Sequence, residues 1–252
     1  MNETWRTVSG VPLLPAGVVH VWRAGVDALA PRAPFFEGLL DQSERDRGAA
    51  FHAVADRLRH TVARGALRWL VGQYLDVAPR WVAFGTGPFG KPHCTGDHAA
   101  RINFNISHSG DIVLIAFSRR GDLGVDVERW SSRLAENERT RIGELVFSSA
   151  ERAAIGMLSS ATEREATFYS LWSRKEAYLK GTGAGISAGL AHVHISADAP
   201  ARLIEDDRDA LAVRHWALRD LDVGTGYSAA LAAKPLGQEV VLLAPTLQMF
   251  DD

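Results

Sequence analysis

The sequence predicts an α+β fold with two small sheets, and the order of its expected elements carries this prediction. A strand and a long helical region come first, several strands follow, and helix and strand patterns then return. This order indicates two similar halves that join near Gly121, although no sequence repeat is visible between them. With 252 residues the chain can form one large domain or two small ones.

The first half begins with a strand at 18–22 and a helical region at 39–74. In that region apolar residues recur at helical spacing, as at Leu58, Val62 and Leu67. Residues 85–96 are rich in glycine and proline, which predicts turns.

Three strands are expected in the middle of the chain. Residues 102–106 alternate cleanly, residues 107–110 break the pattern, and residues 112–118 form an apolar run. A turn at 119–122 precedes a third strand at 123–127. Together these segments predict an antiparallel meander.

Two helices are expected in the second half. Ser148 and Glu151 fit a capping box that opens the first helix. A similar box at 162–165 opens a longer helix, which Gly181 and Gly183 end. Residues 130–141 are polar and predict a loop or an exposed helix. Residues 192–195 and 227–233 have strand patterns.

Composition excludes several classes of protein. The formal net charge of −2 provides no broad basic field for nucleic acid. A single cysteine, Cys94, rules out a disulfide framework and a cysteine-rich zinc site, and it lacks a partner that would make it a nucleophile. The start has no signal-peptide pattern, and the apolar run at 240–245 is too short to span a bilayer. We therefore expect a soluble, cytoplasmic protein.

Lysine is rare in this chain, and its positions are informative. Only four of the 28 cationic residues are lysines, and two of them, Lys175 and Lys180, lie in one stretch with Glu176. Lysine presents a compact point charge, which suits phosphate. The stretch therefore indicates a phosphate-binding site.

Two carboxylates, Asp126 and Glu128, are two residues apart in an expected strand. Alternation places both on one face, about 6–7 Å apart, where they repel each other unless a cation lies between them. Oxygen ligands of this kind suit Mg²⁺. Charged residues at a strand end are also common without any metal.

Glu176 is the candidate for a third ligand. Trp172, Glu176 and Lys180 are spaced by four residues and share one helix face. An ordinary surface Glu–Lys pair would have the same spacing, but the large apolar Trp172 on that face favours a buried setting.

A set of short motifs resembles the surfactin-type 4′-phosphopantetheinyl transferases. The motifs, which occur in the family's order and spacing, are Gly90-Lys91-Pro92, Phe104-Asn105-Ile106-Ser107-His108-Ser109, Gly124-Val125-Asp126-Val127-Glu128, Phe147-Ser148, and Trp172-Ser173-Arg174-Lys175-Glu176-Ala177 with Lys180. No single motif is specific, but the set spans about residues 45 to 190 in register.

The resemblance implies a monomeric pseudo-dimer whose two similar subdomains each hold a small antiparallel sheet and a long helix. The expected N-terminal subdomain, 1–121, contacts the adenosine and 3′-phosphate of coenzyme A. The expected C-terminal subdomain, 122–252, holds the metal and the pyrophosphate.

The resemblance also implies an activity, the transfer of the 4′-phosphopantetheine arm of coenzyme A to a serine of an acyl or peptidyl carrier protein. The by-product is 3′,5′-ADP, and the metal is Mg²⁺ or Mn²⁺. The partners implied are coenzyme A and the carrier protein, without nucleic acid or membrane. Whether the carrier belongs to fatty acid, polyketide or peptide synthesis is left open.

Residue roles follow from the same resemblance. Asp126, Glu128 and Glu176 match the metal ligands, while Lys175 and Lys180 match the pyrophosphate contacts. The other coenzyme A contacts would be Gly90, Lys91 and Pro92 near the adenine and ribose, and Ser107, His108, Arg47 and Arg59 near the phosphates.

Phosphoryl transfer requires positioning and charge stabilisation, so Lys180 would stabilise the departing charge. The proton acceptor stays open between Glu128, Glu176 and a water that one of them orients. Two alternatives are a Mg²⁺-dependent carboxylate nuclease and a non-catalytic module that binds carrier proteins.

Residues 130–146, with Arg133, Arg139 and Arg141, are the candidate surface for an acidic carrier protein, with a solvated linker as the alternative. The pair His192 and His194 is explained as two residues on one face of a strand and not as a metal pair.

Overall fold

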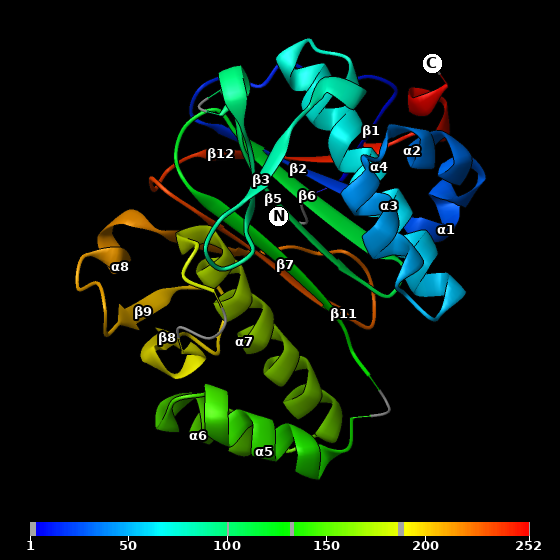
Figure 1. Ribbon diagram of the computed structural model, residues 1–252. Helices are drawn as coiled ribbons and strands as arrows, with labels where there is room; N and C mark the ends of the chain where they lie inside the picture. The colour runs from blue at the N-terminus through cyan, green and yellow to red at the C-terminus, as the bar shows by residue number, and fades with distance from the viewer. Residues whose placement is uncertain (1–3, 100, 132–133, 186–188, 252) are drawn as a thin grey trace. The chain divides into compact units, whose positions relative to one another are not determined.

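The computed structural model describes residues 4–99, 101–131, 134–185 and 189–251 (Figure 1). The chain divides into two units. The first contains Met1–Gly87, Pro92–Arg120 and Glu239–Asp252, and the second contains Pro88–Lys91 and Gly121–Gln238. Each unit combines a small sheet with one helix of 22 residues, so the predicted α+β class is confirmed.

A five-stranded sheet forms the base of the first unit, in the order β1-β12-β2-β6-β5. Strand β2 (Val18–Gly25) is parallel to β12 (Glu239–Pro245) and antiparallel to β6 (Ile112–Ser118). The outer strands are β1 (Arg6–Val8) and β5 (Asn103–Ser109). The sheet is thus mixed where an antiparallel one was expected, because β12 returns from the far end of the chain and pairs in parallel with β1 and β2.

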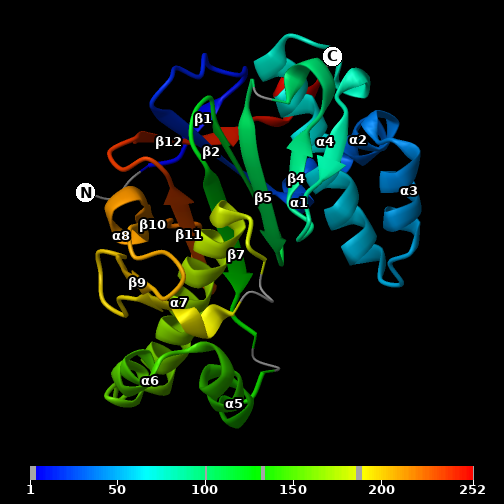
Figure 2. The same cartoon turned by 60° about the vertical axis from the view of Figure 1, so that its left-hand side comes forward.

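The helices of the first unit cover one side of this sheet (Figures 1 and 2). Helix α4 (Val54–Leu75) contributes Leu67 and Val71 to the core that also contains Phe117. The region predicted to be helical, 39–74, is interrupted after α3, because the chain turns there and α3 packs back against α4. The other elements of this unit are α1 (Val26–Leu29), α2 (Ala33–Leu39), α3 (Gln42–Ala49), an antiparallel pair of β3 (Phe84–Thr86) and β4 (Pro92–Cys94), and short 3-10 segments at Ala30–Arg32, Pro79–Trp81, Gly96–His98 and Leu247–Phe250.

The second unit is built on an antiparallel sheet in the order β10-β11-β7. The long helix α7 (Ala161–Thr182) packs against β7 and β11, and both views show it alongside β7 (Figures 1 and 2). The strands of this sheet are β7 (Leu123–Arg129), β10 (Ala217–Asp220) and β11 (Tyr227–Ala233). The remaining elements are α5 (Glu136–Val146), α6 (Ser149–Gly156), a 3-10 segment (Leu190–His192), β8 (Val193–Ile195), β9 (Leu203–Asp206) and α8 (Ala212–His215).

Helix ends follow the sequence closely. The capping box of Ser148 and Glu151 opens α6 as predicted. The box that opens α7 is formed by Ser160 and Glu163, two residues before the expected position. Gly183 ends α7 in a left-handed conformation, with φ of 71°, which glycine adopts at little cost.

The expected meander is only partly correct. Strands β5 and β6 pair in antiparallel fashion, but β7 pairs with β11. The turn before β7 explains this pairing, because Gly121 has φ of 85° and a Cβ there would lie 1.8 Å from the carbonyl oxygen of Lys234. Lys234 donates its backbone N–H to Asp122, so the start of β7 is tied to the residue that follows β11.

The division of the chain also differs from a single cut at residue 121. Gly121 does begin the main part of the second unit. However, Glu239–Asp252 belongs to the first unit because it carries β12, and Pro88–Lys91 belongs to the second. No helix in the described part of the chain is long and apolar enough to cross a membrane.

Candidate active site

The candidate site lies where α7 crosses β7 in the second unit. Gly124, Asp126 and Glu128 share one face of β7 because they are two residues apart. A Cβ at Gly124 would lie 2.1 Å from the carbonyl oxygen of Ala177 and 2.3 Å from the backbone nitrogen of Gly181. Only glycine therefore allows the helix to approach the strand this closely, which brings side chains of α7 within reach of the carboxylates.

The three predicted carboxylates lie together. Asp126 is 1% exposed and Glu176 is 3% exposed, while Glu128 is half-buried. Burial raises the pKa of Glu176 to about 7, and the charges of Asp126 and Glu128 add to this rise while Lys180 opposes it. Such mutual influence requires the groups to be close, so the structure brings together the residues that the sequence proposed.

Lys180 pairs directly with one of these carboxylates. Its Nζ lies 2.5 Å from Oδ1 of Asp126. Burial alone would lower the pKa of Lys180, but Asp126, Glu176 and Glu128 outweigh it and raise that pKa. The lysine is therefore held as a cation at the carboxylates.

The donor set fits a hard divalent cation. Oε1 of Glu176 is buried and accepts no hydrogen bond from the described residues. A buried carboxylate oxygen without a partner is costly, and a bound ion would satisfy it. Oxygen ligands from Asp126, Glu128 and Glu176 are the kind that Mg²⁺ prefers.

Lys175 occupies a different environment from Lys180. It is fully buried, and its ammonium lies 2.7 Å from Oε2 of Glu151. It also donates to the carbonyl oxygens of Val146 and Leu190, and it lies over the ring of Phe147. Three acceptors match the three N–H groups of an ammonium. This placement argues against the expected contact of Lys175 with the pyrophosphate.

The pairing of Lys175 with Glu151 was missed by sequence reasoning, which assigned Glu151 only to a helix cap. Glu151 does cap α6, but it also accepts the backbone N–H of Ile195 at 2.8 Å. Burial lowers the pKa of Lys175, and Glu151 opposes that effect. The pair thus fixes α6 to the position of α7 that directly precedes Glu176.

Lys91 also contacts this part of the chain. Its Nζ donates to the carbonyl oxygens of Leu123 and Gly181 at 3.1 and 2.9 Å, which links the start of β7 to the end of α7. Burial lowers the pKa of Lys91, and the Asp122 carboxylate opposes this. Gly90, directly before it, has a positive φ of 85°.

The other predicted coenzyme A contacts belong to the first unit. Pro92 begins β4, Ser107 is buried in β5 and His108 is exposed on the same strand. Arg47 is exposed on α3. Arg59 on α4 donates from Nε to the carbonyl oxygen of Gly110 at 2.7 Å, and its Nη1 pairs with Asp56 at 2.6 Å. The expected contacts are therefore divided between the two units.

Two family comparisons match the chain on either side of residue 121. The family described as "4'-phosphopantetheinyl transferase, N-terminal" matches residues 33–120. The family described as "4'-phosphopantetheinyl transferase superfamily" matches residues 122–232.

Curated relatives agree with this match. The chain is 31% identical over 191 residues to the 4′-phosphopantetheinyl transferase HetI of Nostoc, covering 74% of this chain and 78% of HetI. The chain is also 34% identical to a Synechocystis protein that is named, provisionally, as a 4′-phosphopantetheinyl transferase. The match covers 69% of this chain and 68% of that protein. The transferase Sfp of Bacillus subtilis is 26% identical, with coverage of 79% and 84%.

The chain belongs to the 4′-phosphopantetheinyl transferase family. It is a transferase that moves the phosphopantetheine arm of coenzyme A to a carrier protein.

Proposed function

We propose that transfer takes place at Asp126, Glu128 and Glu176 with a bound divalent cation. The observation that carries this proposal is the buried Oε1 of Glu176, which accepts no hydrogen bond from the described residues. The carboxylate of Asp126, which acts on the pKa of Glu176, already pairs with Lys180. Bound Mg²⁺, or Mn²⁺ in its place, would neutralise and orient the diphosphate of coenzyme A.

The serine hydroxyl of the carrier attacks the β-phosphorus of coenzyme A in line. A bond forms between the serine oxygen and phosphorus, the bond from phosphorus to the bridging oxygen breaks, and the electron pair leaves with 3′,5′-ADP. The serine proton passes to Glu128 or Glu176, or to a water that one of them orients. Lys180 stabilises the charge on the departing phosphate because its ammonium is already held in place by Asp126.

Coenzyme A contacts are proposed from both units. In the second unit Gly90 and Lys91 would lie near the adenine and ribose, together with Pro92 of the first unit. In the first unit Ser107, His108, Arg47 and Arg59 would contact the phosphates. Lys175 is left out of this set because its three N–H groups already have acceptors.

Helix α5 is proposed as the docking surface for the carrier protein. Arg141 and Leu145 are exposed and four residues apart, so they share one face, and Leu145 is 77% exposed. Exposed Glu138 and Glu144 lie three residues on either side of Arg141, so the attraction to an acidic partner on this face would come from Arg141 alone, with Leu145 as the apolar contact. Arg139 is engaged with Glu165, and Arg133 lies outside the described residues. A monomeric state and a cytoplasmic location stay predictions.

Intact-mass measurement tests the proposal. Apo carrier proteins of the three synthesis types are incubated with coenzyme A and Mg²⁺, and then with a chelator in place of Mg²⁺. We expect a mass gain of one phosphopantetheine that the chelator abolishes. Full transfer in the chelator would remove the metal from the proposal. Nucleic-acid cleavage without any transfer would favour the nuclease alternative, and carrier binding without a mass gain would favour the non-catalytic module.

A further inference from the structure

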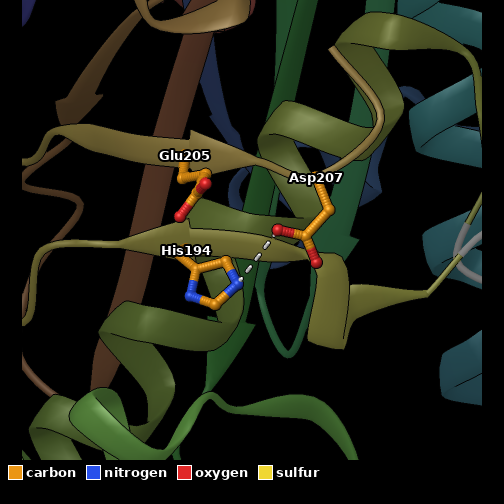
Figure 3. A group of neighbouring side chains, drawn as sticks. All are labelled: His194, Glu205 and Asp207. Carbon is orange, nitrogen blue, oxygen red and sulfur yellow. Dashed lines mark ion pairs between the residues drawn. The ribbon is translucent and has the colours of Figure 1, made fainter. Parts of the chain in front are cut away.

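A second group of ligand-type side chains lies on the β8–β9 strand pair, in the same unit. His194 on β8 and Glu205 on β9 are Cα partners in the antiparallel register. Asp207 lies in the turn directly after β9, two residues beyond Glu205. Figure 3 shows the three side chains converging. Potential ligand atoms of all three lie within 4.8 Å of one another.

The separations are compatible with a transition metal. Nε2 of His194 lies 3.6 Å from Oδ1 of Asp207. A zinc ion with bonds of about 2.0–2.2 Å needs donor atoms roughly 3–4 Å apart. This pair already meets that requirement, and a carboxylate oxygen of the exposed Glu205 lies within 4.8 Å of both ligand atoms.

The backbone around these residues is fixed independently of any ion. The N–H of Asp207 donates to the carbonyl oxygen of His192 at 3.0 Å. Asp206, between Glu205 and Asp207, accepts a hydrogen bond from Tyr178 of α7 at 2.8 Å and pairs with Arg208 at 2.9 Å. The ligand side chains therefore project from two anchored strands and the turn after β9, which lowers the entropy lost when they bind an ion.

An outer partner is also present. Nδ1 of His192 lies 3.2 Å from Oδ2 of Asp207, the oxygen that does not face His194. Metal-binding carboxylates are usually held in orientation by such a contact. From the sequence, His192 and His194 are interpreted only as two residues on one face of a strand. The carboxylates near them are eleven or more residues away in the sequence and approach them only because β8 pairs with β9.

We propose that His194, Glu205 and Asp207 form a binding site for a divalent transition-metal ion, best represented by Zn²⁺, with His192 orienting Asp207. The proposed ligands are one imidazole and two carboxylates, which leave the fourth coordination position of the ion to solvent. This set favours Zn²⁺ over Mg²⁺, because Mg²⁺ prefers oxygen ligands alone. The ion would join β8 to β9 and stabilise the fold without taking part in transfer.

Calorimetric titration of the untagged full chain with Zn²⁺, in excess Mg²⁺, tests this site. We expect one ion per chain, and His194→Ala should weaken binding by at least about tenfold, a loss seen even when an outer partner of a ligand is removed. His215→Ala is the matched control, because His215 is exposed on α8 in the same unit and should leave binding unchanged.

Two further measurements separate this site from the carboxylates of β7 and α7. Zn²⁺ should raise the melting temperature of the wild type and of Glu176→Gln, but not of His194→Ala. Zn²⁺ binding that survives His194→Ala, or that Glu176→Gln abolishes, would overturn the proposal. The outcome does not depend on the transfer reaction, so the site can fail while the proposed function stands.

Discussion

Each unit contains a partly buried cluster of charged side chains, and the two clusters differ in the charges that surround their buried carboxylate. In the first unit Glu44 accepts hydrogen bonds from both Arg64 and Arg68, at 2.8 Å and 2.5 Å from their Nε atoms. Asp41 pairs with the same Arg68. Although partial burial acts to raise it, the pKa of Asp41 is lowered by the backbone N–H of Glu44, the hydroxyl of Ser43 and the charge of Arg68. Two carboxylates thus meet two guanidinium groups.

In the second unit the groups that act on the buried Glu176 are mostly negative. The charged groups that shift the pKa of Glu176 are two carboxylates, Asp126 and Glu128, and one ammonium, Lys180. The pKa of Glu176 rises for this reason and because of burial, the opposite direction from Asp41.

The cluster around Glu44 has the features of a structural ion network, and the cluster around Glu176 has those of a binding site. A buried ion network with balanced charge is satisfied within the fold, so it supports the fold and offers little to a ligand. A buried network with excess negative charge is satisfied by an additional cation or, at lower pH, by a proton. The first cluster should therefore affect stability, and the second should affect transfer.

The largest expected effect is at the carboxylates. Asp126→Ala or Glu176→Ala should abolish transfer, because each removes a ligand of the proposed metal, while far-ultraviolet circular dichroism stays that of a folded protein. Asp198→Ala is the control, since Asp198 is an exposed carboxylate paired only weakly with Arg202. Full activity in either site variant would refute the metal assignment.

Breaking the balanced cluster should instead cost stability. Glu44→Gln leaves the guanidinium of Arg68, which is 2% exposed, without a carboxylate at Nε. Removing one partner of a buried pair typically costs about 3–5 kcal/mol, and we expect the lower end of this range because Arg68 keeps its pair with Asp41. Urea unfolding measures this loss, and the transfer rate per folded molecule should change little. A rate loss without a stability loss would show that the first cluster is more than structural.

Substitution of Lys175 compares a structural charge pair with the candidate site on the same helix, α7. Lys175→Met leaves Glu151 buried without its ammonium and should lower the free energy of unfolding by about 3 kcal/mol. The double variant Lys175→Met with Glu151→Gln should recover part of this loss, because no unpaired charge then remains. If Lys175→Met raises the KM for coenzyme A and leaves stability intact, Lys175 contacts the substrate after all.

The sequence predicted which of the proposed residues lie close together better than it predicted their surroundings. Strand alternation and helical spacing are local, so they placed Asp126 with Glu128 and Glu176 with Lys180 on shared faces. Lys175 is adjacent to Glu176 and therefore projects about 100° around the helix, where only tertiary packing against α6 decides its environment. The pairings of β7 with β11 and of β12 with β2 are equally non-local, and no pattern within those strands identifies their partners.

The raised pKa of Glu176 predicts a pH dependence in chelator-treated protein. Its folded pKa of about 7 exceeds the ordinary 4.5, so between these values the native state holds a proton that the unfolded state has released. The free energy of unfolding should therefore fall by up to about 3 kcal/mol as the pH rises through this window. Urea unfolding across the window should lose this slope in Glu176→Gln and keep it in Glu37→Gln, an exposed control. An unchanged slope in Glu176→Gln would assign the dependence to another group.

Lys180→Ala should have the smallest effect. It also best distinguishes the roles of the two lysines of α7, Lys175 and Lys180. The Lys180 ammonium is held by Asp126, so its removal withdraws one preorganised charge from the departing phosphate. Losing one such contact should lower the rate of transfer by at least about tenfold. Lys234→Ala, which removes a lysine from a turn of the same unit, should leave the rate unchanged. The rate is measured with saturating coenzyme A and carrier, so that a loss reports on the transition state and not on binding. If Lys180→Ala transfers at the wild-type rate, the excess negative charge at this site binds a metal without help from the lysine.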